Sequence, residues 1–100
     1  QVMGPAKAAL EAAIRYLARE LGPDNIRLNA VSAGAIRTLS SSGVKQFGEM
    51  LKVAGAHSAL RRNVTPEEIG QAIAFLLHPA SGGITGQSIY VDCGYNIMAN

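Results

Sequence analysis

One stretch of the sequence combines the groups that could hold a polar ligand. It is A-V-S-A-G-A-I-R-T-L-S-S-S-G, at residues 30–43, where an apolar run stops at a glycine and serines and a threonine follow. Gly34 allows a tight turn and a close approach to the backbone. The N–H groups of Ile36 and Arg37 and the hydroxyl of Thr38 suit an amide or a phosphate. An ordinary exit from a strand into a loop explains the same residues equally well.

A lysine within an apolar segment is the second candidate. Lys7 lies in an alanine-rich stretch, so its ammonium group must reach water or a partner. Reaching the surface is the commoner outcome for a lone lysine. The functional alternative is a cation in a cleft, where it lowers the pKa of a neighbour or bonds sugar hydroxyls.

The elements that must position these residues follow from the apolar periodicity. We expect a helix over residues 3–21 with Gly22 as its C-cap, then a strand over 26–32 that is buried on both faces. Residues 36–57 are expected to form a loop and a short helix. The next helix begins at T-P-E-E, where Thr65 and Glu68 form a capping box, and it runs to about residue 78. Its expected buried side consists of Ile69, Ile73, Leu76 and Leu77, and a short strand follows at 89–91.

This order of elements predicts the fold class. A helix separates the two strands, so a parallel crossover is the expected connection. The chain therefore reads as an α/β protein, namely the second half of a doubly wound parallel sheet. In such a sheet, ligands bind beyond the carboxyl ends of the strands, and residues 33–38 follow such an end.

The composition excludes several classes. The 100 residues are 48% hydrophobic and 16% charged, which is typical of a globular domain with one core. The net charge is +2 and the basic residues are scattered, so we expect no nucleic-acid surface. No apolar run approaches the about 20 residues needed to cross a membrane. Cys93 is the single cysteine, which favours a reducing compartment, and His57 and His78 are expected in surface loops without metal-ligand spacing.

Three motifs together resemble a known family. They are M-G-P-A-K-A-A-L-E at 3–11, N-A-V-S-A-G-A-I-R-T-L at 29–39 and G-I-T-G-Q-S-I-Y-V-D at 83–92. They resemble short-chain dehydrogenases/reductases and, more narrowly, the NADH-dependent enoyl-[acyl-carrier-protein] reductases of bacterial-type fatty acid synthesis. The resemblance covers the whole chain. It implies that residues 1–100 are the C-terminal portion of one Rossmann-like domain, with a substrate-binding loop at about 36–57.

The narrower resemblance depends on where a tyrosine would lie. Most of the superfamily has a tyrosine four residues before the lysine, where this chain has Met3. The enoyl reductases have it seven residues before, which at about 100° per residue brings tyrosine and lysine to one helix face. That position immediately precedes Gln1, so we expect the chain to be a fragment and its catalytic tyrosine to lie upstream.

The resemblance assigns a role to each candidate residue. Lys7 would bond the nicotinamide ribose and help to hold the charge of the transition state. Ile36 would bond the nicotinamide carboxamide, Thr38 would contact the pyrophosphate, and Arg37, Leu39 and Ser40 would complete the cofactor-binding loop. The substrate would contact Ala35, which stands where the family usually has proline, and the acyl pocket would be lined by Val44, Phe47 and Met50. Plain core packing remains the alternative for the last three.

The implied reaction is the conjugate reduction of a trans-2-enoyl thioester, carried by acyl carrier protein, with NADH. The resemblance also implies a homotetramer. The single cysteine, the scattered charge and the lack of a long apolar run lead us to expect a cytoplasmic protein that binds no nucleic acid and no membrane. Two alternatives stay open. One is a reductase of the same superfamily that acts on a keto or hydroxy group, and the other is a non-catalytic nucleotide-binding or oligomerisation module.

Overall fold

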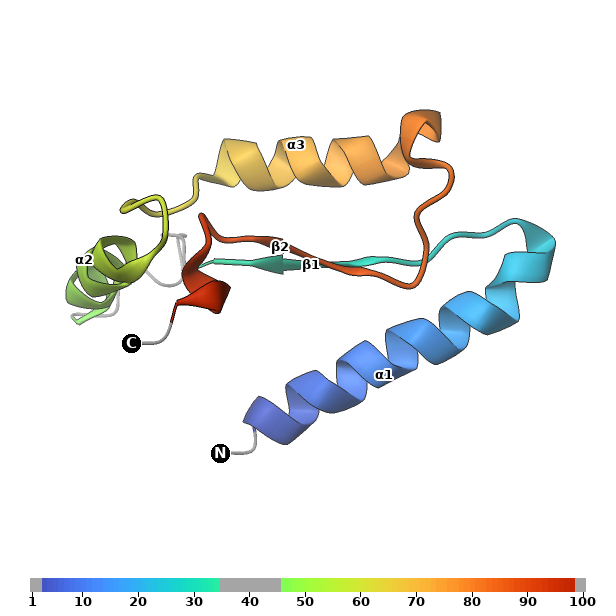
Figure 1. Ribbon diagram of the computed structural model, residues 1–100, viewed down its shortest axis with the longest axis horizontal. Coiled ribbons are helices and arrows are strands. Elements are labelled where there is room, and N and C mark those ends of the chain that lie inside the picture. The colour runs from blue at the N-terminus through green and yellow to red at the C-terminus, as the bar shows by residue number, and fades with distance from the viewer. Residues whose placement is uncertain (1–2, 35–45, 99–100) are drawn as a thin grey trace. The chain divides into compact units, whose positions relative to one another are not determined.

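The computed structural model describes residues 3–34 and 46–98. Its helices and strands follow the predicted order (Figure 1). They are α1 (Met3–Leu21), β1 (Ala30–Ala33), α2 (Phe47–His57), α3 (Pro66–Leu77) and β2 (Ser88–Val91), with 3₁₀ turns η1 (Gly22–Asp24), η3 (Pro79–Ser81) and η4 (Tyr95–Ile97). The predicted helix–strand–helix–helix–strand order is confirmed.

The two strands form a parallel pair. The N–H of Ala30 donates to the carbonyl of Gln87 at 2.8 Å. Four residues further along both segments, the N–H of Gly34 donates to the carbonyl of Val91 at 3.1 Å. Pairing that advances in the same direction along both strands is the parallel arrangement. The α/β class and the parallel crossover connection are therefore confirmed.

Strand β1 begins later than the sequence predicted. The backbone of Leu28 is hydrogen-bonded, but not in the pattern of a regular β-sheet. Its N–H donates to the Thr85 hydroxyl at 3.1 Å, and its carbonyl accepts from the N–H of Gly86 at 2.8 Å. Regular pairing starts only at Ala30. The expectation of a strand buried on both faces is also wrong. Most residues of both strands are half-buried, since the sheet has two strands within the described residues.

The end of α1 differs in detail from the prediction. The helix ends at Leu21 as expected, but Gly22 and Pro23 continue into the turn η1. Asn25 takes the left-handed conformation, with φ 60°, and its N–H donates to Gly22 at 2.8 Å. Asparagine tolerates this conformation because its short side chain can bond locally, so the reversal falls three residues beyond the expected glycine.

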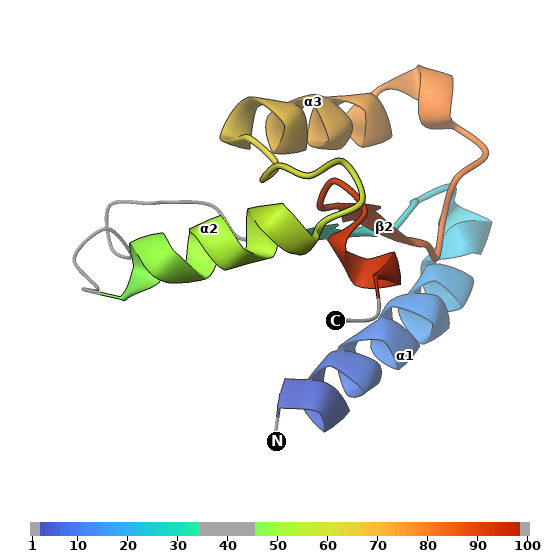
Figure 2. The same ribbon diagram turned by 60° about the vertical axis from the view of Figure 1, so that its left-hand side comes forward.

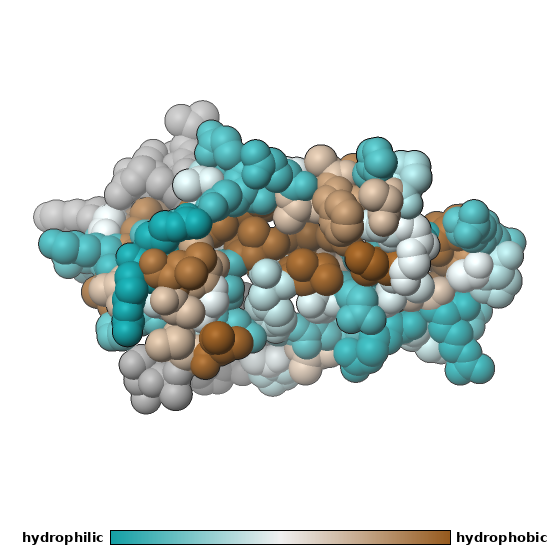
Figure 3. All heavy atoms as spheres, turned by 45° about the horizontal axis from the view of Figure 1, so that its top comes forward, coloured by the Kyte–Doolittle hydropathy of each residue, from teal (hydrophilic) through white to brown (hydrophobic). Residues whose placement is uncertain are grey.

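Helix α3 buries less of its apolar side than expected. Ile69 and Leu76 are half-buried, whereas Ile73 is exposed and Leu77 is 78% exposed. Ile73 and Leu77 line an open groove together with Leu28 and Val31. The prediction for these two residues is wrong because a narrow sheet covers only part of a helix face, and apolar side chains remain visible on the surface (Figure 3).

The chain divides into two compact units. Unit 1 comprises Gln1–Val31 and Ile73–Ile89, and unit 2 comprises Ser32–Ala72 and Tyr90–Asn100. Unit 1 therefore holds α1 and the amino-terminal ends of both strands, and unit 2 holds α2 and their carboxyl-terminal ends.

Each unit has a small buried centre. In unit 1 Ala18 is 6% exposed, and a Cβ on Gly86 would lie 3.4 Å from the Ala18 methyl group. In unit 2 Val64 is 6% exposed, and α2 contacts η4 (Figure 2). None of the helices within 3–34 and 46–98 is long and apolar enough to cross a membrane.

Candidate functional site

The chain is packed closely at Gly34, directly after the carboxyl end of β1. A Cβ on Gly34 would lie 3.1 Å from the Cβ and 3.2 Å from the Cα of Asp92, and 3.2 Å from Val64 Cγ1. Such contacts are tighter than ordinary van der Waals separation, so a larger residue at position 34 would push Asp92 and Val64 outward by a few tenths of an ångström. Gly34 thus fixes where the main chain leaves the sheet toward residues 35–45.

Asp92 organises the turn that follows β2. Its Oδ1 accepts from the N–H of Gly94 at 3.0 Å, and its Oδ2 accepts from the N–H of Asn96 at 2.9 Å. Both carboxylate oxygens therefore bind the main chain of the same turn. The bonds hold η4 beside the strand end.

The turn after β2 also contacts the segment after α2. Gly94 has φ 82°, and a Cβ there would lie 2.6 Å from the Cβ of Ala59. The N–H of Leu60 donates to the carbonyl of Cys93 at 3.0 Å, and Cys93 is itself left-handed with φ 55°. Both the backbone conformation and the close contact require glycine at position 94.

The C-terminal end of α2 is fixed to the loop that follows it. Ser58 is 1% exposed; its Oγ accepts from the N–H of Arg62 at 3.0 Å and lies within donating distance of the carbonyls of Gly55 and Arg62, at 3.1 and 2.8 Å. The amide Nδ2 of Asn63 donates to the carbonyl of Leu51 at 2.8 Å. These bonds hold α2 in one direction relative to residues 58–63.

The predicted capping box at the start of α3 is confirmed. The N–H of Glu68 donates to Thr65 Oγ1 at 3.1 Å, and the N–H of Thr65 donates to Glu68 Oε1 at 2.9 Å. Arg62 adds a bidentate pair that the sequence did not reveal, with Nη1–Oε1 at 3.0 Å and Nη2–Oε2 at 2.8 Å. The bonds from Arg62 and then from the Thr65 N–H lower the pKa of Glu68 from 4.5 to about 2, because they stabilise its ionised form.

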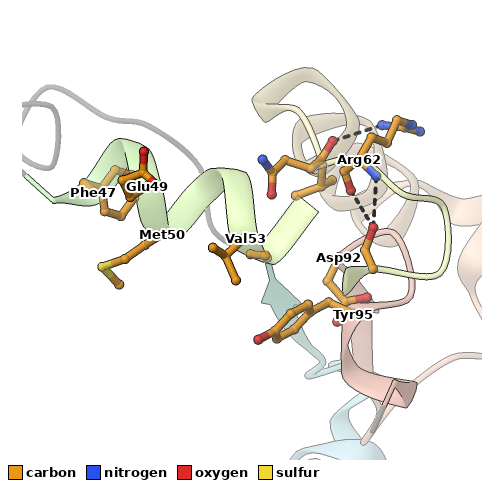
Figure 4. A pocket seen from close by; sticks show the side chains of 12 residues that line it. Phe47, Glu49, Met50, Val53, Arg62, Asp92 and Tyr95 are labelled. Carbon is orange, nitrogen blue, oxygen red and sulfur yellow. Dashed lines mark hydrogen bonds between the residues drawn. The ribbon is translucent and has the colours of Figure 1, made fainter. Parts of the chain in front are cut away.

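These elements line a half-open cavity of about 500 Å³ (Figure 4). Phe47, Met50 and Val53 line it from α2, and Tyr95 lines it from the turn after β2. Gly34, Val64 and Asp92 belong to the same lining, so the cavity adjoins the carboxyl ends of the strands. The structure thus places two predicted substrate-binding residues, Phe47 and Met50, in one cavity. Their contact with a substrate stays a prediction.

The remaining predicted residues lie elsewhere. Lys7 is exposed on α1, in unit 1. His57 is exposed but ends α2, so its expected place in a loop is wrong, and its Nδ1 lies 3.0 Å from the carbonyl of Val53. No group of three potential metal ligands occurs among residues 3–34 and 46–98. Seven predicted site residues fall outside the described residues: Ala35, Ile36, Arg37, Thr38, Leu39, Ser40 and Val44.

Sequence reasoning missed most of the lining, including Val53, Asp92 and Tyr95. Val53 continues the stripe of Phe47 and Met50 at the same spacing of three, which could have revealed it. Asp92 and Tyr95 had no such signal, because they reach the cavity only through the pairing of β2 with β1.

Comparisons with known proteins agree on one family. A family model described as Enoyl-(Acyl carrier protein) reductase matches residues 1–96. The Rickettsia conorii protein named Enoyl-[acyl-carrier-protein] reductase [NADH] FabI is 54% identical over 99 residues, which are 99% of this chain and 38% of that protein. The chain thus spans less than half the length of the curated relatives that it matches.

Two solved structures share the fold. The enoyl-acyl carrier protein reductase of Bacillus cereus, solved with NADP⁺ and an indole naphthyridinone, superimposes with a TM-score of 0.88 at 48% identity, covering 99% of this chain and 38% of that one. The reductase of Anaplasma phagocytophilum, solved with NAD, also gives 0.88, at 47% identity and the same coverage. The predicted Rossmann-like fold of the short-chain dehydrogenase/reductase type is therefore confirmed.

Proposed function

We propose that this chain, which belongs to the enoyl-(acyl carrier protein) reductase family, forms the C-terminal portion of an NADH-dependent enoyl-[acyl-carrier-protein] reductase. In this proposal residues 1–100 belong to a single Rossmann-like domain with a substrate-binding loop at about 36–57. The observation that carries the substrate side is the cavity beside the strand ends, with Phe47 and Met50 in its wall. The full enzyme would reduce the trans-2 double bond of an enoyl thioester on acyl carrier protein, in fatty acid synthesis.

The described residues fit a nicotinamide dinucleotide. Gly34 lies directly after the carboxyl end of a parallel strand, which is where such folds bind dinucleotides. NADH, when bound, would supply the hydride that reduces the substrate. Lys7 would bind the nicotinamide ribose and hold positive charge near the developing enolate. The loop residues Ile36, Arg37, Thr38, Leu39 and Ser40 would bind the carboxamide and the pyrophosphate.

The remaining tasks concern the substrate and the assembly. Ala35, Val44, Phe47 and Met50 would contact the acyl thioester, and an upstream tyrosine would donate a hydrogen bond to its carbonyl oxygen. NADH is proposed from the name of the R. conorii relative, whereas the B. cereus structure holds NADP⁺. We further propose a cytoplasmic homotetramer that binds neither nucleic acid nor membranes.

The test uses the full-length protein that contains this chain. We expect it to consume NADH in the presence of crotonyl thioester but not with the corresponding β-ketoacyl thioester. Replacement of Lys7 by alanine should lower kcat/KM about 100-fold, because charge stabilisation in the transition state is lost. Arg19→Ala, which removes another exposed cation from α1, is the matched control and should leave kcat/KM unchanged. Absence of enoyl-dependent NADH consumption in the unaltered protein would refute the proposal.

A further inference from the structure

We propose that Val53 and Tyr95, which line the cavity of unit 2, determine how long an acyl chain the enzyme accepts. This inference rests on the function proposed above. It goes beyond it by naming residues that select among enoyl thioesters of different length.

The apolar wall extends well past the residues that the sequence suggested. Phe47, Met50 and Val53 follow one another at intervals of three along α2 and line the same cavity. At 1.5 Å per residue, the helix advances about 9 Å from the first to the last of them. Of the three α2 side chains Phe47, Met50 and Val53, that of Val53 lies nearest to Tyr95 in Figure 4, at the end of the cavity away from Phe47. A chain lying along this wall would meet Val53 and Tyr95 last.

Several polar groups in the lining already have partners within the protein. Both oxygens of Asp92 accept from the main chain, and the Asn63 Nδ2 donates to Leu51. The guanidinium of Arg62 is bonded to Glu68. Donors and acceptors satisfied in this way offer little to a polar ligand. Glu49 adds a carboxylate to the lining beside Phe47 (Figure 4), so the wall that favours an apolar occupant is the one formed by Met50, Val53 and the ring of Tyr95.

The apolar residues around the cavity still have surface to bury. Met50 is 60% exposed, Val53 is 53% exposed and Tyr95 is 50% exposed. The volume of about 500 Å³ lies within the range of about 300–1,000 Å³ that is usual for small-molecule sites. Each methylene that such a site buries favours binding by about fourfold, so chain length should be strongly sensed until the cavity is full.

The experiment compares crotonyl and dodecenoyl thioesters with the full-length enzyme. Val53→Phe fills the far end of the cavity, so the ratio of kcat/KM for dodecenoyl thioester to kcat/KM for crotonyl thioester should fall at least about tenfold. Val53→Ala and Tyr95→Ala remove bulk from the same end and should raise the ratio of activity on longer chains to activity on shorter ones. The matched control is Ala56→Phe, which adds the same ring at an exposed position of α2 outside the lining.

The outcomes separate this inference from the proposed function. If the unaltered enzyme reduces neither thioester, the proposed function fails and the inference fails with it. If it reduces both but Val53→Phe lowers the two activities equally, or leaves their ratio unchanged, the inference alone is wrong. If Val53→Phe does not fold, the two alanine variants decide, because an unchanged ratio in both would overturn the inference.

Discussion

The two ends of the parallel pair are held by different means. At the amino-terminal ends, in unit 1, side chains bind the strands and their neighbours. Arg27 donates to the carbonyls of Ile84 and Leu76, at 3.1 and 2.9 Å. Asn29 donates to the Ile84 carbonyl at 3.0 Å and accepts from the N–H of Gln87 at 3.0 Å. Side-chain hydrogen bonds of this kind hold a scaffold together across distant parts of the sequence.

At the carboxyl-terminal ends, in unit 2, close packing against two glycines is added to the side-chain hydrogen bonds of Asp92. A Cβ on Gly94 would lie 2.6 Å from Ala59 Cβ, and a Cβ on Gly34 would lie 3.1 Å from Asp92 Cβ. The cavity opens beside this glycine packing, at the end of the sheet where α/β proteins bind their ligands. The difference teaches that both ends of the pair contribute to stability, whereas the cavity lies at the carboxyl-terminal ends only. Changes at the amino-terminal ends should affect stability alone.

The largest expected effect on stability is at the carboxyl-terminal end. Gly94→Ala should destabilise the full-length protein by about 3 kcal/mol, because it adds left-handed strain to an overpacked contact with Ala59. Thermal unfolding measures the loss. Gly70→Ala is the control, since nothing lies within 4 Å of a Cβ there, and helix propensity predicts a gain of about 0.5–1 kcal/mol. Equal unfolding temperatures for both variants would contradict the close contact.

A smaller effect is expected at the amino-terminal end. Arg27→Ala should destabilise the protein by about 2 kcal/mol, because two carbonyls lose a charged donor. We expect kcat to stay unchanged in the folded variant, since Arg27 lies outside the cavity lining. Denaturant unfolding and steady-state kinetics measure the two quantities, with the exposed Arg15→Ala as control. If Arg27→Ala lowered kcat and left the stability unchanged, the amino-terminal ends of the strands would serve catalysis rather than stability, and the prediction would be wrong.

The smallest effect depends on pH and concerns the ion pair before α3. The pKa of Glu68 is lowered from 4.5 to about 2 in the folded protein, so its contribution to stability is present above pH 4.5 and is lost as the pH falls toward about 2. The stability difference between the unaltered protein and Glu68→Gln should therefore shrink over this range. Urea unfolding at several pH values measures it.

The control for this prediction removes the partner instead. In an Arg62→Met background the same Glu68→Gln change should show a weaker dependence on pH, since the largest cause of the lowered pKa is gone. A difference that is independent of pH in both backgrounds would show that the Arg62–Glu68 pair does not act in solution.

Local signals in the sequence located the helices well. The apolar periodicity and small residues gave α1 its bounds at Met3 and Leu21, and T-P-E-E gave the start of α3 through a cap that spans only three residues. The family motifs were equally visible, and so were Phe47 and Met50. All of these patterns depend on residues that are close in the chain, where backbone geometry fixes the neighbours.

Longer-range features had to come from the folded chain. Tyr95 and Val53 line the same cavity, and Asp92 packs against Gly34. The residues of each pair are far apart in the sequence, where no periodic pattern connects them. The exposure of Ile73 and Leu77 depends on how wide a sheet lies beneath α3, which residue types do not state. Periodicity tells which side of a helix is apolar, whereas burial depends on what tertiary contacts cover that side.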